Sequence, residues 1–410
     1  MKILYLVHQF FPEHQSGTEK FVLNLALQAL NYGHDVKVIT YSFLGDETFS
    51  NDDGEIYSKE YSYKNIPVIA YKYKNSSDHV LNVLESKKLR NFAIKTIIDE
   101  NPDILHFGHI IRVHEFIWAA INLDIPYIIT LTDFFLICPK INLITSKGSL
   151  CNGPNSGTKC NASCSELNNN YIRYRLEKAK EILENARHVF SPSKFVQKIF
   201  QHELKQIQIE INPHGISLVN LSKPNKFIGE KNKLVLAYLS RITEIKGIRV
   251  LIEAFSRIES DDIVLKIYGA GEEKYLNNLQ ESVKGDERII FLGEYDSSQL
   301  ISIYQQIDLS IIPSLCYETF SMVLHESLAC NVPVLVSGIG ALAEKIRSGE
   351  NGLTFLPGDV LDLQNKIEFL TRRPDVLVEM KSFIKNHVFI PKIREEFEKY
   401  LRFYIKSVKN

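Results

Sequence analysis

Two glutamates, separated by seven residues, lie in the stretch IDLSIIPSLCYETFSMVLHESLACNVPVLVS, residues 307–337. The apolar run before Glu318 predicts a buried strand that stops at Pro313, and VPVLVS predicts the next strand. Between these strands, Glu318 falls in a polar loop and Glu326 about two turns into a helix. Glu318 can accept hydrogen bonds from sugar hydroxyls, and Glu326 can bind the two hydroxyls of a ribose.

The start of this expected helix offers hydrogen-bond donors to an anion. Backbone N–H groups in the first turn of a helix lack partners and carry partial positive charge. The amides of Phe320, Ser321 and Met322 can therefore hold a phosphate. The alternative is an ordinary helix whose first glutamate favours the helix dipole and whose second glutamate is solvated.

Two cations follow an earlier apolar run, LVLAYLS, which predicts another strand. Arg241 comes directly after this run, Lys246 lies five residues further on, and Gly247 opens a helical pattern. Cations at the carboxyl end of a strand can converge on a diphosphate. Alternatively, both are surface residues beside the helix that begins at Gly247.

The glutamate spacing, the Pro-Ser pair before Glu318 and the helix VLHESLA resemble the donor-site signature of the retaining family-4 glycosyltransferases. The fold of that family is called GT-B. The resemblance implies that Glu318 lies beside the transferred sugar and Glu326 beside the ribose of the nucleotide. It also implies that Arg241 and Lys246 bind the leaving diphosphate, and that Leu292 lies where backbone atoms bind the nucleobase.

The loop at Glu318 departs from the family pattern. Where the family usually reads Glu-Gly-Phe-Gly, this chain reads Glu318-Thr319-Phe320-Ser321. Both replacements add a side chain beside the donor. They therefore bear on which sugar is bound and leave the expected architecture unchanged.

Strand and helix patterns alternate from Lys2 to about residue 212, which predicts a doubly wound, mostly parallel sheet. After the first strand, Gly17 can let the backbone approach a diphosphate, and Thr18 can cap the next helix. The family has two glycines where this chain has Ser16-Gly17, and a simple turn between strand and helix is the alternative. The expected strands are KILYLV, DVKVIT, PVIAYKY, DILHF, IPYIITL and HVFSPS.

Polar side chains follow two of these strands, at the sheet edge where ligands bind in such folds. His106 and His109 come near the end of DILHFGHI, and Thr132 and Asp133 follow IPYIITL. Either histidine can hydrogen-bond the acceptor or the phosphates, or can be an ordinary strand-end residue. Many family members carry a functional histidine at the position of Thr132. A proton-transfer role here would therefore fall to His106, His109 or Asp133.

Four of the six cysteines lie in the long segment that follows Asp133. Their spacing does not match the paired knuckles of a zinc site, and we expect free thiols in a reducing compartment. A metal ion or a labile disulfide that pins an acceptor-side loop is the alternative. These cysteines are Cys138, Cys151, Cys160 and Cys164.

The chain has 410 residues and a formal net charge of −1, which indicates two globular domains and gives no electrostatic reason for a nucleic-acid partner. The first apolar run is too short for a signal peptide, and no run approaches the ~18 apolar residues of a membrane span. We therefore expect a cytoplasmic protein. Basic amphipathic helices at residues 85–98 and 169–185 predict either peripheral contact with the anionic inner face of a membrane or ordinary exposed helices.

A segment rich in Pro, Gly, Asn and Lys breaks the alternation and predicts a linker. We expect an acceptor-side Rossmann-like domain at residues 1–212 and a nucleotide-sugar-binding Rossmann-like domain at residues 213–388. A basic, aromatic helix at residues 389–410 would return to the first domain. The resemblance implies the α/β class and the GT-B arrangement, in which two doubly wound domains face each other across a cleft.

Together, the residues and the resemblance predict a retaining transferase. It would move a sugar from a nucleotide diphosphate donor to a glycan or lipid-linked acceptor in bacterial surface polysaccharide synthesis. No cofactor or metal is expected, because Arg241 and Lys246 would neutralise the diphosphate and the second domain has no Asp-x-Asp motif. The alternatives are a sugar-nucleotide epimerase of related fold and a donor-binding homologue without activity.

Overall fold

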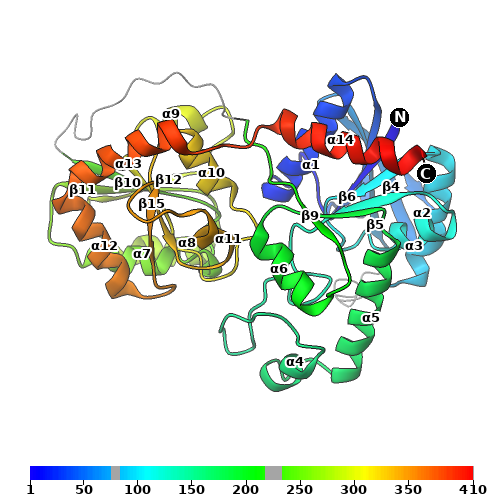
Figure 1. Cartoon of the computed structure of the whole chain (residues 1–410), viewed down its shortest axis with the longest axis horizontal. Helices are drawn as coiled ribbons and strands as arrows, with labels where there is room; N and C mark the ends of the chain where they lie inside the picture. The colour runs from blue at the N-terminus through cyan, green and yellow to red at the C-terminus, as the bar shows by residue number, and fades with distance from the viewer. Residues whose placement is uncertain (75–83, 218–232, 410) are drawn as a thin grey trace. The chain divides into compact units, whose positions relative to one another are not determined.

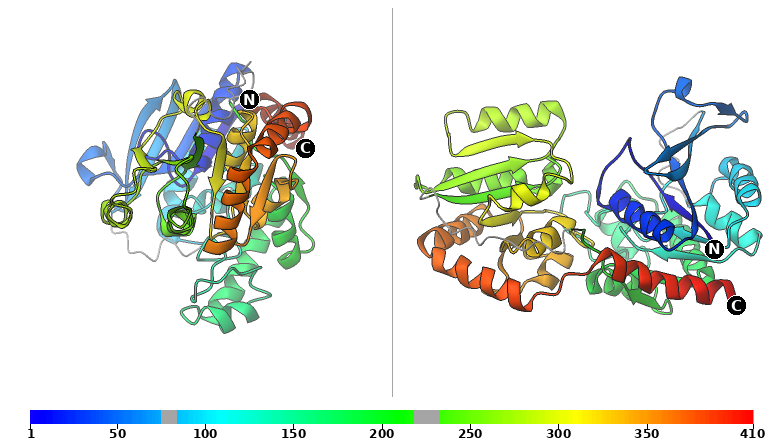
Figure 2. Two further views of the ribbon diagram at one scale, coloured as in Figure 1. Left: turned by 90° about the vertical axis from the view of Figure 1, so that its left-hand side faces the viewer. Right: turned by 90° about the horizontal axis from the view of Figure 1, so that it is seen from above.

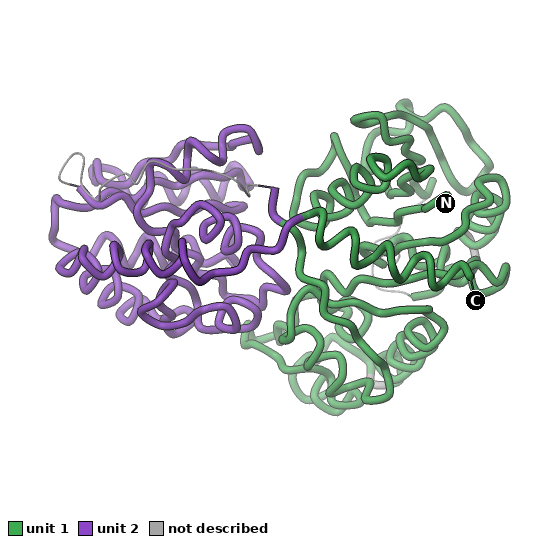
Figure 3. Tube along the Cα trace, turned by 45° about the horizontal axis from the view of Figure 1, so that its top comes forward, with its two compact units in different colours: residues 1–215, 393–410 green, residues 216–392 purple. Residues whose placement is uncertain are grey.

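The chain forms two compact units, which are coloured separately in Figure 3. The computed structural model describes residues 1–74, 84–217 and 233–409. Unit 1 comprises residues 1–215 and 393–410, and unit 2 comprises residues 216–392. The expected boundaries, after residues 212 and 388, fall three to four residues before those of the structure.

Unit 1 is built on one sheet whose central strands are parallel and buried (Figure 1). Apolar runs such as that of β1 are buried almost throughout, as expected of parallel strands that are covered on both faces. The strand order is β3-β4-β5-β2-β1-β6-β7-β8-β9. The strands are β1 Lys2–Val7, β2 Asp35–Tyr41, β3 Asn51–Asp52, β4 Ile56–Tyr63, β5 Ile66–Tyr73, β6 Ile104–Phe107, β7 Tyr127–Thr130, β8 His188–Ser191 and β9 Ile209–Ile211.

The helices of unit 1 include one that comes from the far end of the chain. α14 packs against α1, and the two lie side by side in Figure 2. Among the described residues, no helix combines the length and apolar character needed to cross a bilayer. The helices are α1 Gly17–Asn31, α2 Lys87–Glu100, α3 Glu115–Asn122, α4 Thr158–Ser163, α5 Asn169–Asn185, α6 Lys194–Glu203 and α14 Ile393–Lys409.

The cap of α1 differs from the predicted one. Ser16, and not Thr18, precedes the helix, and it forms a capping box with Glu19. The Ser16 amide donates to Oε2 of Glu19 at 2.7 Å, and the Ser16 hydroxyl contacts the same oxygen. The prediction failed because a Thr at the second helical position was given the role that the preceding Ser fulfils.

α14 also binds the segment that leaves unit 1. Oε1 of Glu396 lies 2.9 Å from Nδ1 of His214, and the Gly215 amide donates to Oε2 at 2.7 Å. Both Glu396 and His214 are buried. Within unit 2, the Ile216 amide donates to the Pro391 carbonyl oxygen at 2.8 Å. The chain therefore enters and leaves unit 2 through two segments that are hydrogen-bonded to each other.

Unit 2 contains a smaller sheet in which every paired strand is parallel. The strand order, β12-β11-β10-β13-β14-β15, places β10 and β13 at the centre as neighbours. The strands are β10 Leu234–Leu239, β11 Ile263–Tyr268, β12 Ile289–Gly293, β13 Leu309–Ile312, β14 Val334–Ser337 and β15 Gly352–Phe355. The helices are α7 Ile248–Ser256, α8 Glu273–Ser282, α9 Leu300–Tyr304, α10 Met322–Ala329, α11 Gly340–Lys345, α12 Val360–Arg372 and α13 Pro374–His387.

Candidate active site

The loop after β10 and the loop after β13 lie together at the carboxyl edge of the unit 2 sheet. The Leu315 amide of one loop donates to the Ile245 carbonyl oxygen of the other at 2.8 Å. Gly247 has a φ of +72°, and a Cβ added there would lie 1.8 Å from the Pro313 carbonyl oxygen. The two loops can approach this closely only because residue 247 is a glycine.

An ion pair joins these two loops. Nζ of Lys246 donates to Oε1 of Glu318 at 2.5 Å, and the Ser314 hydroxyl donates to the same oxygen at 2.8 Å. Burial by itself would lower the pKa of Lys246 and raise that of Glu318. Their attraction prevails, so the pKa of Lys246 lies above its ordinary value and the pKa of Glu318 lies below. Both side chains are therefore charged at neutral pH.

Arg241 supplies a second positive charge at the same edge. The side chain is exposed, and its backbone carbonyl accepts a hydrogen bond from the Tyr238 hydroxyl at 2.7 Å. The charge of Arg241 acts on both Lys246 and Glu318, and it contributes to the low pKa of the Glu318 carboxyl. The structure thus brings the three predicted residues together. Ser314 belongs to the Pro-Ser pair of the family resemblance, but its contact with Glu318 was not predicted.

The start of α10 differs in detail from the prediction. The helix begins at Met322, and Ser321 is its N-cap, whose side chain accepts from the Leu324 amide at 3.4 Å. Phe320 therefore lies outside the helix, and the prediction that its amide belongs to the first turn is wrong. Its ring stacks on that of His325 with the centroids 3.8 Å apart. Ser321 stands where the family usually has glycine and adopts a φ of +65°, a value that favours glycine.

Glu326 is buried, which excludes the alternative of a solvated surface glutamate. Only 5% of its surface is exposed. The phenols of Tyr295 and Tyr304 have raised pKa values, first because they are buried and second because Glu326 is negatively charged. Glu326 therefore lies close to both phenols. Because α10 begins at Met322, Glu326 lies just over one turn into the helix and not two.

Two further predicted donor contacts lie in the same unit. Leu292 is near the carboxyl end of β12 and is 45% exposed, while the neighbouring Gly293 carbonyl accepts from the Gly269 amide at 2.8 Å. Thr319 lies in the loop between β13 and α10 and is half-buried. The structure places both at the carboxyl edge, and their contacts with a nucleotide stay predictions.

In unit 1, a histidine and an aspartate from neighbouring strands meet at the carboxyl edge of the sheet. Nε2 of His109, after β6, lies 2.6 Å from Oδ2 of Asp133, after β7. The Ile111 amide donates to Nδ1 of His109 at 3.1 Å, so a neutral ring carries its proton on Nε2, towards Asp133. The other oxygen of Asp133 accepts from the Phe135 amide at 3.0 Å. The Asp133 side chain is 22% exposed, although its Oδ2 is buried and forms no hydrogen bond of standard geometry with a described residue.

His8 and Glu19 extend this group, and neither was assigned a role at the site from the sequence. The rings of His8 and His109 lie 3.9 Å apart, and Nε2 of His8 is 3.6 Å from Oε1 of the fully buried Glu19. The missed signal was position, because His8 directly follows β1 as His109 follows β6. Gly17 is the first residue of α1, beside Glu19. Its contact with a diphosphate stays a prediction.

His106 does not belong to this group, and its predicted role at the site is wrong. Its side chain is fully buried. Its ring nitrogens lie 2.6 Å from the Tyr404 hydroxyl and 2.8 Å from the Thr130 hydroxyl. As a strand residue, His106 points into the core beneath α14, whereas the later His109 reaches the sheet edge. Burial lowers the pKa of His106 to about 3, so the ring is neutral at physiological pH.

Neither Thr132 nor the four cysteines are part of the His109–Asp133 pair. The Thr132 hydroxyl donates to the Gly108 carbonyl oxygen at 2.7 Å, which ties the loop after β7 to the loop after β6. The four cysteines of the long loop are free thiols, and burial raises the pKa of Cys160 to about 12. Within residues 1–74, 84–217 and 233–409, no three His, Cys, Asp or Glu side chains are grouped so that they could hold a metal ion.

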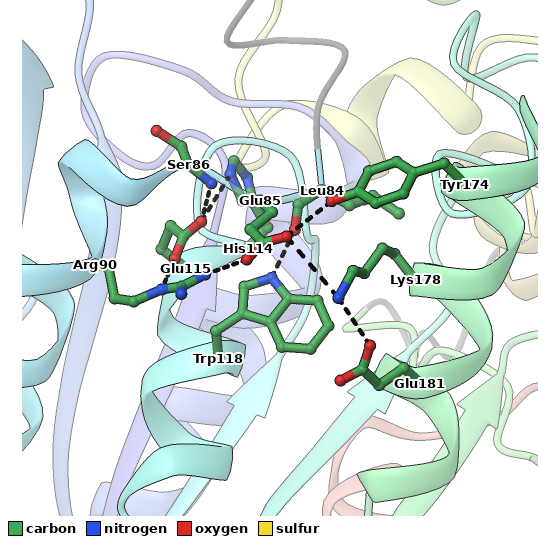
Figure 4. A network of polar contacts seen from close by, with 10 residues as sticks. All are labelled: Leu84, Glu85, Ser86, Arg90, His114, Glu115, Trp118, Tyr174, Lys178 and Glu181. Atoms are coloured by element: carbon green, nitrogen blue, oxygen red, sulfur yellow. Dashed lines mark hydrogen bonds and ion pairs between the residues drawn. The ribbon is translucent and has the colours of Figure 1, made fainter. Parts of the chain in front are cut away.

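A partly buried polar network joins α2, α3 and α5 of unit 1 (Figure 4). Nε of Arg90 donates to Oε2 of Glu115 at 3.0 Å, and the Trp118 indole donates to the Leu84 carbonyl oxygen at 2.6 Å. His114 lies fully buried beside this network, and burial lowers its pKa to about 3. Like His106, it is neutral in the folded protein.

These two histidines predict that unit 1 loses stability in mild acid. An unfolded histidine titrates near pH 6.5, so below that pH the unfolded chain binds protons that the folded chain excludes. The free energy of unfolding should fall by up to about 1.4 kcal/mol per pH unit and per histidine between about pH 6.5 and pH 3. Urea titrations at pH 7.5 and 5.5, followed by the fluorescence of the sole tryptophan, Trp118, measure this change.

Two variants distinguish the effect of the buried histidines on the pH dependence of stability from that of other titrating groups. His106→Gln should be less stable at pH 7.5 but should show a smaller loss between the two pH values. His202→Gln, on the exposed face of α6, should keep the full pH dependence. Equal pH dependence in all three proteins would contradict the assignment.

Two α/β units, each built on a mostly parallel sheet, define the fold as GT-B, and solved structures confirm this fold over nearly the whole chain. HepE from Anabaena, solved in complex with UDP and glucose, matches with a TM-score of 0.68 at 17% identity and covers 98% of both chains. Sucrose-phosphate synthase from Thermosynechococcus elongatus matches with a TM-score of 0.71 at 18% identity, covering 99% of this chain and 98% of that one.

Sequence comparison identifies the family. The Glycosyltransferase Family 4 model matches residues 15–219, and the Glycosyl transferases group 1 model matches residues 222–387. The chain therefore belongs to glycosyltransferase family 4.

Individual relatives match over one part of the chain. Phosphatidyl-myo-inositol mannosyltransferase of Mycobacterium leprae is 32% identical over 172 residues, which are 41% of this chain and 45% of the relative. An uncharacterised glycosyltransferase of Methanocaldococcus jannaschii is 29% identical over 181 residues, 44% of this chain and 46% of the relative. The chain thus spans about half the length of the curated relatives it matches.

Proposed function

We propose that the protein is a retaining glycosyltransferase that uses a nucleotide diphosphate sugar as donor and a glycan or a lipid-linked hydroxyl compound as acceptor. The observation that carries this proposal is the Lys246–Glu318 ion pair, held by Ser314 beside Arg241. The relatives of this chain include a lipopolysaccharide N-acetylglucosaminetransferase of Salmonella typhimurium, which supports a role in surface polysaccharide synthesis.

Unit 2 would bind the donor. As the bond between the sugar and the diphosphate breaks, negative charge accumulates on the diphosphate, and Arg241 and Lys246 would stabilise it. Glu318 holds Lys246 in place through Oε1, which leaves Oε2 to accept a hydrogen bond from a sugar hydroxyl. Glu326 would bind the ribose. HepE, which shares the fold, was solved with UDP and with UDP-glucose.

Unit 1 would recognise the acceptor. Asp133 would accept a hydrogen bond from the acceptor hydroxyl, while His109, whose Nε2 lies 2.6 Å from Oδ2, would hold that carboxylate in place. In the proposed step the departing diphosphate takes the proton of the acceptor hydroxyl. The acceptor oxygen then bonds to the anomeric carbon on the face that the diphosphate leaves, so the anomeric configuration is retained.

A panel of labelled nucleotide sugars, incubated with and without bacterial-type lipid-linked acceptors, tests the function. We expect transfer that requires an acceptor, release of a nucleoside diphosphate and a product of retained configuration by NMR. Release of a sugar isomer without acceptor would indicate an epimerase. Donor binding without turnover across the panel, or an inverted product, would also contradict the proposal.

The ribose assignment predicts that Glu326→Ala weakens nucleotide binding. Loss of hydrogen bonds to a charged acceptor costs about 1.5–3 kcal/mol, or roughly 10- to 100-fold in affinity. Calorimetry with uridine and guanosine diphosphates measures this change, with Glu281→Ala, on the exposed part of α8, as the control. Since Glu326 is buried, circular dichroism must show that the variant is folded. If a folded Glu326→Ala protein bound both nucleoside diphosphates with wild-type affinity, the assignment of Glu326 to the ribose would be wrong.

The proposal also predicts that transfer persists in EDTA, because two side-chain cations take the place of a metal at the diphosphate. Complete loss of transfer on chelation, restored by magnesium, would contradict this mechanism. A partial loss that magnesium does not restore would point to the cysteine loop, and a zinc assay on the same material would test that explanation.

A further inference from the structure

The last two turns of α14 expose two stripes side by side. Leu401, Ile405 and Val408 recur at the spacing of one helix face, and 41% of Ile405 and 40% of Val408 are exposed. A cationic stripe lies one position further along the chain, and its three side chains are exposed. Its residues are Arg402, Lys406 and Lys409. The opposite face of the helix is anchored in the core of unit 1 through Phe397, Tyr400 and Tyr404.

The cationic stripe is not neutralised within unit 1. Among the residues that the structure describes, none of its three side chains forms an ion pair with a carboxylate. Glu398 lies within electrostatic range of Arg402 but is paired with Arg394, whose Nε lies 2.8 Å from Oε1. Burial and then the charge of Lys406 lower the pKa of His188, with Glu210 opposing and Arg187 adding to the effect, so Lys406 lies within electrostatic range of the start of β8.

The helix at residues 169–185, which the sequence suggested as a membrane contact, lacks such a surface. Its Arg175 is buried and donates to the Phe135 carbonyl oxygen. Nζ of Lys178 lies 3.0 Å from Oε2 of Glu181 and 3.9 Å from Oε2 of Glu85. Figure 4 shows both ion pairs. Three of the four cations of α5 are therefore buried or paired with a carboxylate, the third being Lys180, whose Nζ lies 3.7 Å from Oε1 of Glu184.

We propose that the exposed face of residues 401–409 is a docking surface for a lipid bilayer with anionic headgroups. Ile405 and Val408 would enter the boundary between headgroups and acyl chains, while the cationic stripe binds lipid phosphates. A helix that exposes apolar and cationic side chains next to each other is suited to this boundary. Each cation near an anionic membrane surface strengthens partitioning about fivefold. The proposal does not depend on sugar transfer.

Vesicle flotation of the full chain tests the surface without any donor or acceptor. Wild-type protein should float with vesicles of phosphatidylglycerol and phosphatidylcholine and far less with phosphatidylcholine alone, and salt should reverse the binding. The Arg402→Gln/Lys406→Gln/Lys409→Gln variant should partition about 10²-fold less. Ile405→Ser/Val408→Ser should also weaken binding while retaining its salt dependence.

The matched control is Arg173→Gln/Lys180→Gln on α5, which removes exposed charge from the alternative helix. This variant should bind anionic vesicles like the wild type. Absence of wild-type binding, equal binding by the triple variant, or loss of binding only in the α5 variant would overturn the proposal. Each variant should keep wild-type fluorescence of Trp118, and a loss of binding counts only if it does.

Discussion

Replacing Lys246 by alanine is expected to lower kcat on the order of 10²-fold or more while changing donor affinity less. The expected cause is that Lys246 gains interaction as charge builds up on the leaving diphosphate, so its loss is felt most in the transition state. Arg241→Ala should behave similarly. Since both cations act on one charge, the double variant should fall by less than the product of the two single losses.

Turnover at donor saturation and donor affinity by calorimetry, measured for both single variants and the double, test this prediction. Arg257→Ala is the control, because this arginine follows α7, is half-exposed and pairs with Glu253. Variants that bind donor poorly yet keep wild-type kcat would show that the two cations bind only the ground state.

Gly247→Ala is expected to separate the two loops of the unit 2 site. A Cβ at residue 247 would lie 1.8 Å from the Pro313 carbonyl oxygen, and the φ of +72° is unfavourable for alanine. Backbone strain of about 1–2 kcal/mol and overpacking of about 1–3 kcal/mol should together destabilise unit 2. Because Lys246 precedes Gly247, kcat should fall as well.

The control for this variant is Gly349→Ala, where φ is +82° but a Cβ would have nothing within 4 Å. It isolates backbone strain from the clash with Pro313. Hydrogen exchange of the Leu315 amide, which donates to Ile245 at 2.8 Å, should accelerate in Gly247→Ala and not in Gly349→Ala. Unchanged exchange of Leu315 in Gly247→Ala would contradict the role of the glycine.

Much of the fold was predictable because buried parallel strands are short apolar runs with clear ends. LVLAYLS predicted β10 to within one residue, and the strand of DILHF is β6. β4, which lies between the short β3 and β5, was not predicted, since it has no apolar run and most of its residues are partly exposed. β9 was missed because three residues carry too little pattern.

The site was predictable where residues follow a strand directly, and less so where the side-chain direction matters. Arg241, Lys246 and Glu318 met as expected, because β10 and β13 are neighbours. His106 was assigned to the edge because periodicity does not reveal which face of a fully buried strand a side chain occupies. His8 and His109 both follow a strand, but their contact depends on β1 and β6 being neighbours, which no local pattern indicates.

The place of α14 has a consequence for the order in which the protein folds during synthesis. Its Phe397, Tyr400 and Tyr404 belong to the same core as β1 and α1, and Tyr404 contacts His106. The whole of unit 2, residues 216–392, leaves the ribosome before this helix does. Unit 2 can therefore complete its core during translation. Unit 1 is synthesised first, but the apolar surface that α14 covers stays exposed until residues 393–409 emerge.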